Sequence, residues 1–84
     1  MGRQICWIEK LAEDVTREVR VDFFAGRIKW QFRRSDHEGW DYDTPPLATD
    51  WAQLEAATFE RYRRRRVPVK QLELVRAERR AAGA

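Results

Sequence analysis

The stretch Val19–Phe32, which reads VRVDFFAGRIKWQF, constrains the fold of this chain most strongly. Apolar residues alternate with mostly polar or charged ones on both sides of Ala25-Gly26. An alternation with a period of two residues is typical of β-strands that bury one face. The stretch therefore predicts a β-hairpin with one apolar face and one polar face.

The register of this hairpin follows from its apolar face, because a slip of one residue would turn a whole strand over. If paired residue numbers sum to 51, the large apolar residues share one face: Val19, Val21, Phe23, Ile28, Trp30 and Phe32. The polar face then pairs opposite charges: Asp22 with Lys29, and Glu18 with Arg33. Each cross-strand pair of this kind contributes about 0.2–1 kcal/mol.

The loop of the hairpin can hold two or four residues in this register. Ala25 suits a positive φ angle poorly, so we expect a four-residue loop over Phe24–Arg27 rather than a two-residue turn. Phe24 is the one large apolar residue on the polar face. We expect the Phe24 side chain either to give partial cover at the turn or to act as a stacking platform next to Arg27.

A further strand is predicted over Arg3–Leu11, ahead of the hairpin. A three-residue loop at 12–14 would set three pairs across the two strands: Ile5 with Val21, Trp7 with Val19, and Glu9 with Arg17. Consecutive strands usually lie side by side, so the three form an antiparallel meander.

Two helices are predicted after the strands. Thr49 or Asp50 is expected to cap a helix that runs to about Arg66, with Gln53 completing a capping box after Asp50. Its apolar stripe is Trp51, Leu54, Thr58 and Tyr62, widened by Phe59. Pro68 suits the first turn of a second helix, which ends near Ala81, and residues 81–84 should fray. The fold class is therefore α+β, in the order β-β-β-α-α, with both helices packed on the apolar face of the sheet.

Length and composition bound the range of functions. Eighty-four residues predict a single small domain, residues 1–84. The one cysteine, Cys6, allows no internal disulfide, and the first twenty residues contain no apolar stretch. We therefore expect a cytoplasmic protein with no signal peptide and no membrane span.

The segment Ser35–Asp50 contains five acidic residues and no Lys or Arg. Its side chains suggest three chemistries: a metal site from Asp36, His37, Glu38, Asp41 and Asp43, acid/base catalysis by His37, and stacking of bases on Trp40 and Tyr42. The spacing matches no calcium loop, no nucleophile is placed for His37, and the carboxylates would repel phosphate. We therefore expect no metal, no cofactor, no small-molecule substrate and no enzymatic activity, with both rings folded over the edge of the sheet.

The basic residues gather in the segment Arg61–Lys70, which contains no acid. They are Arg61, Arg63, Arg64, Arg65, Arg66 and Lys70. All but three of the seventeen basic residues of the chain are Arg, whose planar guanidinium suits two-point contact with phosphate or carboxylate. Helix capping alone does not need five arginines. We therefore expect an anion-binding surface, unless the acidic loop Asp36–Asp43 neutralises it.

Together these features predict a non-enzymatic binding module that contacts the nucleic acid backbone with little sequence readout, because no motif for reading bases is present. The alternative is a protein-interaction module or accessory subunit that binds an acidic protein surface or uses Leu74, Phe24 or Trp40. In that case the arginines could pair with the chain's own acidic loop.

Overall fold

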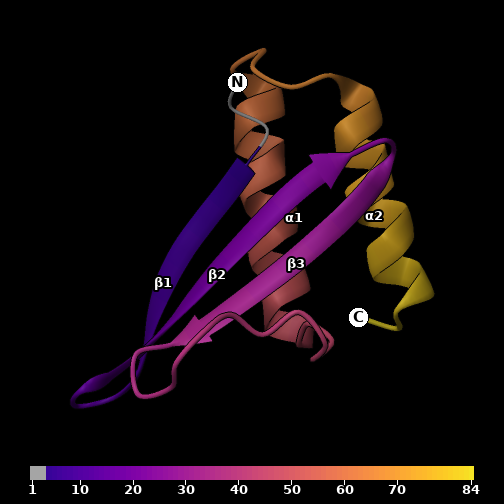
Figure 1. The fold of residues 1–84 in the computed structure, drawn as a ribbon. Helices are drawn as coiled ribbons and strands as arrows, with labels where there is room; N and C mark the ends of the chain where they lie inside the picture. Colours follow the sequence, from indigo (N-terminus) through magenta and orange to yellow (C-terminus); the bar gives the residue numbers. More distant parts are fainter. Residues whose placement is uncertain (1–3) are drawn as a thin grey trace. The chain divides into compact units, whose positions relative to one another are not determined.

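The computed structural model describes residues 4–84, which form three strands followed by two helices (Figure 1). The elements are β1 (Gln4–Ala12), β2 (Val15–Phe24), β3 (Arg27–Arg34), α1 (Ala48–Arg63) and α2 (Val69–Ala81). The strands make one antiparallel sheet in the order β1-β2-β3. This order confirms the predicted α+β fold class, β-β-β-α-α. Contacts group the sheet and its following loop, up to Pro45, into one compact unit, and residues 25–27 with 46–84 into a second.

The predicted register between β1 and β2 is confirmed. Trp7 pairs with Val19, Ile5 with Val21 and Glu9 with Arg17. Glu9 and Arg17 also form an ion pair of 2.8 Å. The predicted start of the strand at Arg3 lies outside the described residues.

The loop between β1 and β2 is shorter than the predicted one of three residues. Ala12 belongs to β1 and pairs with Val15, so only Glu13 and Asp14 form the turn. The pairing shifts between Lys10 and Ala12, which leaves Leu11 as an extra residue on β1. A bulge of this kind absorbs one residue into the strand and so shortens the loop.

The predicted four-residue loop of the hairpin is wrong. Phe24 ends β2 and Arg27 begins β3, so the turn consists of Ala25 and Gly26 alone. Their φ angles are 51° and 72°, the positive values of a type I′ turn. That turn matches the twist of the two strands, and this match outweighs the cost of holding Ala25 in the left-handed region. The predicted pair of Glu18 with Arg33 is confirmed by an ion pair of 3.2 Å.

The sheet has one buried and one more exposed face. The buried positions are Ile5, Val19, Val21, Phe23 and Phe32, which all lie on the predicted apolar face. Trp7 and Trp30 on that face are half-buried and meet edge to face, with ring centroids 6.2 Å apart. The other face leaves Ile8 and Phe24 67% and 77% exposed. The apolar positions of the alternating sequence are therefore the ones that the sheet buries, and the polar positions are the more exposed ones.

Helix α1 begins two to three residues earlier than predicted, and its N-cap is Leu47. Asp50 is the third residue of the helix, and its carboxylate accepts a hydrogen bond of 2.8 Å from the Leu47 backbone N–H. The side chain thus reaches back to the cap, as in the second half of a capping box. Thr49 and Asp50 are not the cap, because the helical hydrogen bonds start at the Leu47 carbonyl, which accepts from the Asp50 and Trp51 N–H groups.

Helix α1 ends at Arg63 rather than Arg66. Arg65 has a φ angle of 60°, and its N–H donates to the Tyr62 carbonyl. The Arg66 N–H donates to the Arg61 carbonyl at 2.8 Å. These two hydrogen bonds form a Schellman motif, with an arginine in the left-handed position that glycine usually holds. The helix therefore stops inside the run of arginines.

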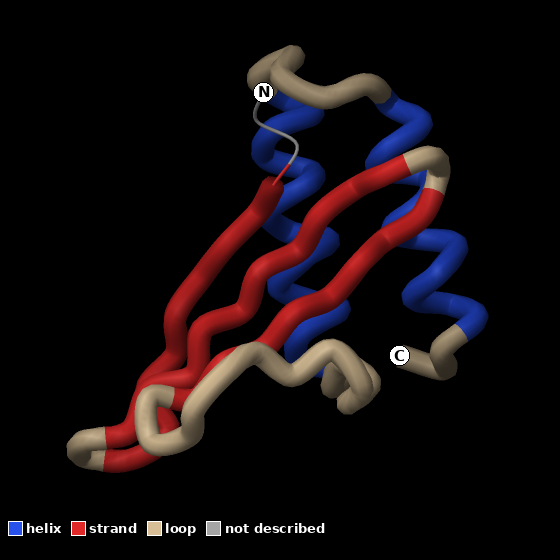
Figure 2. Tube along the Cα trace, viewed as in Figure 1, coloured by secondary structure: helices blue, strands red, loops and turns tan. Residues whose placement is uncertain are grey.

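Helices α1 and α2 pack against each other and are joined by residues 64–68 (Figure 2). Trp51, Leu54 and Thr58 are buried as predicted, whereas Tyr62, also in the predicted stripe, is exposed. On α2 the buried residues are Leu72 and Val75. The sequence predicts fraying for residues 81–84. In the structure the N–H groups of residues 82–84 donate hydrogen bonds to carbonyls in the last turn of α2, and Gly83 holds a φ angle of 75°.

Candidate anion-binding site

The segment Arg61–Lys70, called the arginine segment below, spans the end of α1, the connection and the first turn of α2. Five of its six basic residues are exposed: Arg63, Arg64, Arg65, Arg66 and Lys70. Arg61 is half-buried on α1. Because the helix stops at Arg63, the later arginines do not follow the rotation of a helix, which would have spread them round its axis. The sequence could not show this, because the left-handed residue is not a glycine.

Ion pairs within the helical unit leave much of this charge unbalanced. A single carboxylate, that of Glu60, lies 3.3 Å from Arg63 and 3.6 Å from Arg64. Arg65, Arg66 and Lys70 make no ion pair with any residue between 4 and 84. Exposed ion pairs contribute at most about 1 kcal/mol, so an external anion can compete with Glu60 for its two arginines.

The backbone adds to the positive potential of the arginine segment. The first turn of α2 contains no acidic residue, so nothing in that turn offsets the positive end of the helix dipole. Lys70 adds its charge in the same turn. At the end of α1, the backbone N–H groups of Arg64, Arg65 and Arg66 satisfy carbonyls of the last turn. These hydrogen bonds occupy the carbonyl oxygens that would otherwise present negative partial charge to an anion.

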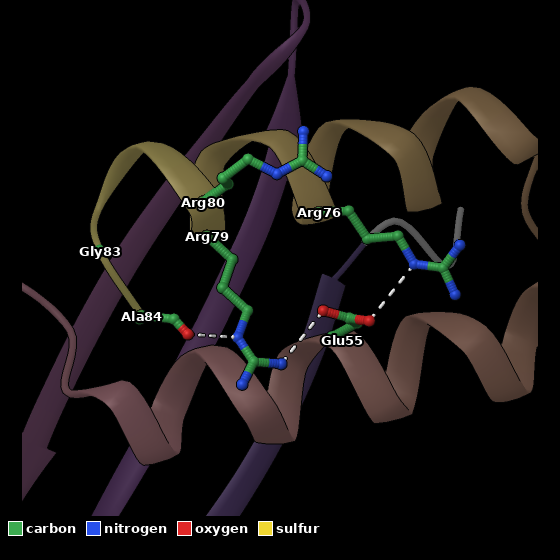
Figure 3. A pocket seen from close by; sticks show the side chains of 6 residues that line it. All are labelled: Glu55, Arg76, Arg79, Arg80, Gly83 and Ala84. Atoms are coloured by element: carbon green, nitrogen blue, oxygen red, sulfur yellow. Dashed lines mark hydrogen bonds and ion pairs between the residues drawn. The ribbon is translucent and has the colours of Figure 1, made fainter.

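Two arginines of α2 that could have extended this surface, Arg76 and Arg79, are engaged elsewhere. Glu55 of α1 accepts hydrogen bonds from Arg76, at 3.2 Å, and from Arg79, at 3.1 Å (Figure 3). Arg79 also donates to the carbonyl oxygen of Ala84 at 2.8 Å. These residues, with Arg80 and Gly83, line an open depression of about 430 Å³. Glu55 fills the role of an anion there, so this cluster ties the two helices together and leaves the arginine segment as the better anion site.

The loop between the sheet and the helical unit is held by cation–π contacts. The guanidinium carbon of Arg20 lies 4.4 Å from the ring centroid of Trp40, and that of Arg33 lies 4.9 Å from it. Asp41 pairs with Phe32 in an isolated antiparallel β-bridge. The Tyr42 ring lies under Lys29 at 5.9 Å. Sequence reasoning places both rings over the sheet edge but misses Arg20 and Arg33 as the partners of Trp40, and Lys29 as the partner of Tyr42.

Two acids of this loop have partners within the same unit. Hydrogen bonding to Arg34 lowers the pKa of Asp36, and the same contact raises the pKa of Arg34. Hydrogen bonds from the Thr44 side chain and from the backbone N–H groups of Asp43 and Thr44 lower the pKa of Asp41. Both carboxylates are therefore already stabilised in their charged form by residues of the sheet unit.

Among residues 4–84, no three His, Cys, Asp or Glu side chains are grouped so as to hold a metal ion. No helix of the same residues is long and apolar enough to cross a membrane. Comparison of the chain with protein-family models, with curated proteins and with solved structures finds no match. The function has to be argued from these residues alone.

Proposed function

We propose that this chain is a non-enzymatic binding module whose arginine segment contacts the phosphate backbone of nucleic acids with little sequence readout. The observation that carries the proposal is the excess charge of that segment. Arg63 and Arg64 share the single carboxylate of Glu60, and Arg65, Arg66 and Lys70 make no ion pair with residues 4–84. Uncompensated arginines at the surface are the usual footprint of a phosphate-binding protein.

The chemistry of the segment suits the oxygens of a phosphate. The guanidinium of arginine presents donors in a fork that matches two oxygens of a phosphate. Arg65 and Arg66 lie in a connection whose backbone is fixed by the hydrogen bonds that close α1. The base of each side chain is therefore already positioned before an anion binds, which lowers the entropy lost on binding.

A second function, as a protein-interaction module, is supported by one specific observation. Phe24 is 77% exposed at the hairpin turn, beside the exposed Arg27. Aromatic residues are enriched in protein–protein interfaces relative to the rest of the surface. Trp40 and Leu74, the other candidates for this role, are half-buried and so contribute less surface to a partner. We propose a cytoplasmic location for either function, because the exposed thiol of Cys6 suits a reducing compartment.

Titration with labelled DNA and RNA, duplex and single-stranded, at several salt concentrations tests the first function. For duplex DNA, the slope of the logarithm of affinity against that of salt is about −0.9 per phosphate contacted. The variant Arg65→Gln with Arg66→Gln should reduce the magnitude of this slope by about 2, since two phosphate contacts disappear. The circular dichroism spectrum should be unchanged, because both side chains are exposed.

Two matched variants sharpen this experiment. Glu60→Gln removes the carboxylate that competes for Arg63 and Arg64, and should therefore strengthen binding. Glu55→Gln removes the same charge from the same helix at the Arg76 cluster, so any larger effect of Glu60→Gln is local to the arginine segment. Equal binding by the folded double variant and the unaltered chain would contradict the proposal, and so would binding that does not depend on salt.

A further inference from the structure

The two edges of the sheet differ in how they are closed. At the β3 edge, Phe32 exchanges two backbone hydrogen bonds with Asp41, of 3.0 and 2.7 Å. At the β1 edge, the strand order β1-β2-β3 gives β1 a single neighbouring strand, β2, with which it pairs. Figure 1 shows β1 as the outer strand of the sheet. An open edge is a row of unpaired donors and acceptors that can bind another strand.

The open edge is regular over seven residues. Gln4–Lys10 pairs with β2 without interruption and contains no proline or glycine, and the register shifts only beyond Lys10. Cys6 and Ile8 are exposed on the less buried face of this stretch, and Ile8 is 67% exposed. Natural edge strands usually carry proline, a bulge or inward-pointing charge to prevent pairing. Within Gln4–Lys10 neither proline nor a bulge is present, which leaves only the charges of Glu9 and Lys10.

From these features we propose that the β1 edge binds a second copy of this chain, so that two three-stranded sheets join into one of six strands. The two copies of β1 would run antiparallel about a two-fold axis at Trp7. A symmetric contact of this kind is the commonest form of homo-oligomer interface. The occupant is a second copy because the sequence of the edge is complementary to itself in one register.

That register can be derived by elimination. Paired residues must lie on the same face of the new sheet, so their numbers sum to an even value. Sums of 18 and 20 oppose Glu9 or Lys10 to its own copy, and like charges directly opposite each other are destabilising. Sums of 12 and 16 use only five of the seven regular residues. A sum of 14 uses all seven, from Gln4 to Lys10, and opposes no like charges.

In this register the exposed apolar side chains meet. Cys6 faces Ile8 of the second copy, and the two-fold axis repeats this pair, so four side chains form one apolar cluster. Gln4 faces Lys10 of the second copy at each end, while its amide keeps the hydrogen bonds to Asp22 and from the Cys6 thiol. Trp7 faces Trp7 of the second copy at the centre. The contact therefore covers Ile8, one of the two most exposed large apolar side chains of the sheet.

Sedimentation velocity of the full chain, from micromolar to millimolar concentration, tests the association itself. We expect a dimer whose population grows with concentration. Ile8→Lys should weaken dimerisation by about tenfold or more, because two new cations enter the apolar cluster. Phe24→Lys is the matched control, since Phe24 is also exposed on this face but lies on β2. A chain that remains monomeric, or equal loss of dimer in both variants, overturns the proposal.

Disulfide formation under mild oxidation tests the register. Opposite residues of antiparallel strands have Cβ atoms about 4.5–5.5 Å apart, close to the range that a disulfide spans. Ile8→Cys places a new thiol opposite Cys6 of the second copy and should give a covalent dimer. Ile8→Cys combined with Cys6→Ser should not, because a sum of 14 does not oppose residue 8 to itself. Equal cross-linking of both variants would show a different register and overturn the pairing proposed.

Discussion

The two-residue turn between β2 and β3 gives the sharpest test of the structure, because two substitutions there should change stability in opposite directions. Ala25 holds a φ angle of 51° in the first central position, where type I′ turns prefer asparagine. Gly26 holds 72° in the second, where glycine is preferred. We therefore expect Ala25→Asn to raise the free energy of unfolding and Gly26→Ala to lower it.

The magnitudes follow from the backbone alone. A Cβ atom built at Gly26 would have no heavy atom within 4 Å, so Gly26→Ala changes no packing. The left-handed conformation costs an L-residue about 1–2 kcal/mol, and the loss of unfolded-state entropy returns about 0.4–1 kcal/mol. The net loss for Gly26→Ala is therefore about 1 kcal/mol. Ala25→Asn should gain about 0.5–1 kcal/mol, because asparagine tolerates this conformation better than alanine.

Urea denaturation followed by tryptophan fluorescence measures both changes, and thermal melts check them. In a chain of this size, 1 kcal/mol corresponds to a shift of about 4–8 °C in Tm. The m-value should stay constant, since neither side chain affects the surface exposed on unfolding. A Gly26→Ala variant as stable as the unaltered chain would refute the two-residue turn and restore the four-residue loop. A destabilised Ala25→Asn variant would have the same meaning.

Two further predictions concern charged residues. Glu55→Gln should lower the free energy of unfolding by about 1 kcal/mol in urea denaturation, because Glu55 binds Arg76 and Arg79 of the other helix. Glu60 binds Arg63 of its own helix and Arg64 directly after it, so Glu60→Gln should lower the free energy of unfolding by less than half as much. A larger loss for Glu60→Gln than for Glu55→Gln would contradict the reasoning. The pKa of Asp41 is lowered in the folded chain by the hydrogen bonds that its carboxylate accepts. The contribution of Asp41 to stability is therefore complete above its pKa in the unfolded chain, about 3.9, and is lost as the pH falls through its lower pKa in the folded chain. Asp41→Asn should therefore make acid unfolding less steep, whereas an unchanged pH profile would show that the hydrogen bonds to Asp41 do not persist in solution.

Much of the fold follows from the spacing of apolar residues. The register of β1 against β2 and the pair of Glu18 with Arg33 are confirmed because a sheet with one buried face allows few registers. The errors lie at element ends, where single residues decide. Ala25 and Arg65 both hold positive φ angles that sequence patterns assign to glycine or asparagine. Their conformations are imposed by the strands and the helix that they connect.

The candidate site was less accessible to sequence reasoning. The six basic residues of the arginine segment could be identified by composition, but their partners could not. That Arg76 and Arg79 bind Glu55 depends on how α1 and α2 align, since the partners are 21 and 24 positions apart in the sequence. The pairing of Arg63 and Arg64 with Glu60 was within reach, because residues three and four apart meet on a helix.

Trp40 has a consequence for how the protein avoids aggregation. The β3 edge is closed by a single bridge at Phe32 and Asp41, and the rings and cations around Trp40 hold that segment in place. Such a small contact can open by itself, at a free energy below that of global unfolding. Each opening would leave β3 as a second unpaired edge of the sheet. The lifetime of the closed loop therefore sets how often other molecules meet a sheet with both edges open. Trp40 thus lengthens the time for which this edge stays closed. Its loss should lower the solubility of the protein before it lowers Tm.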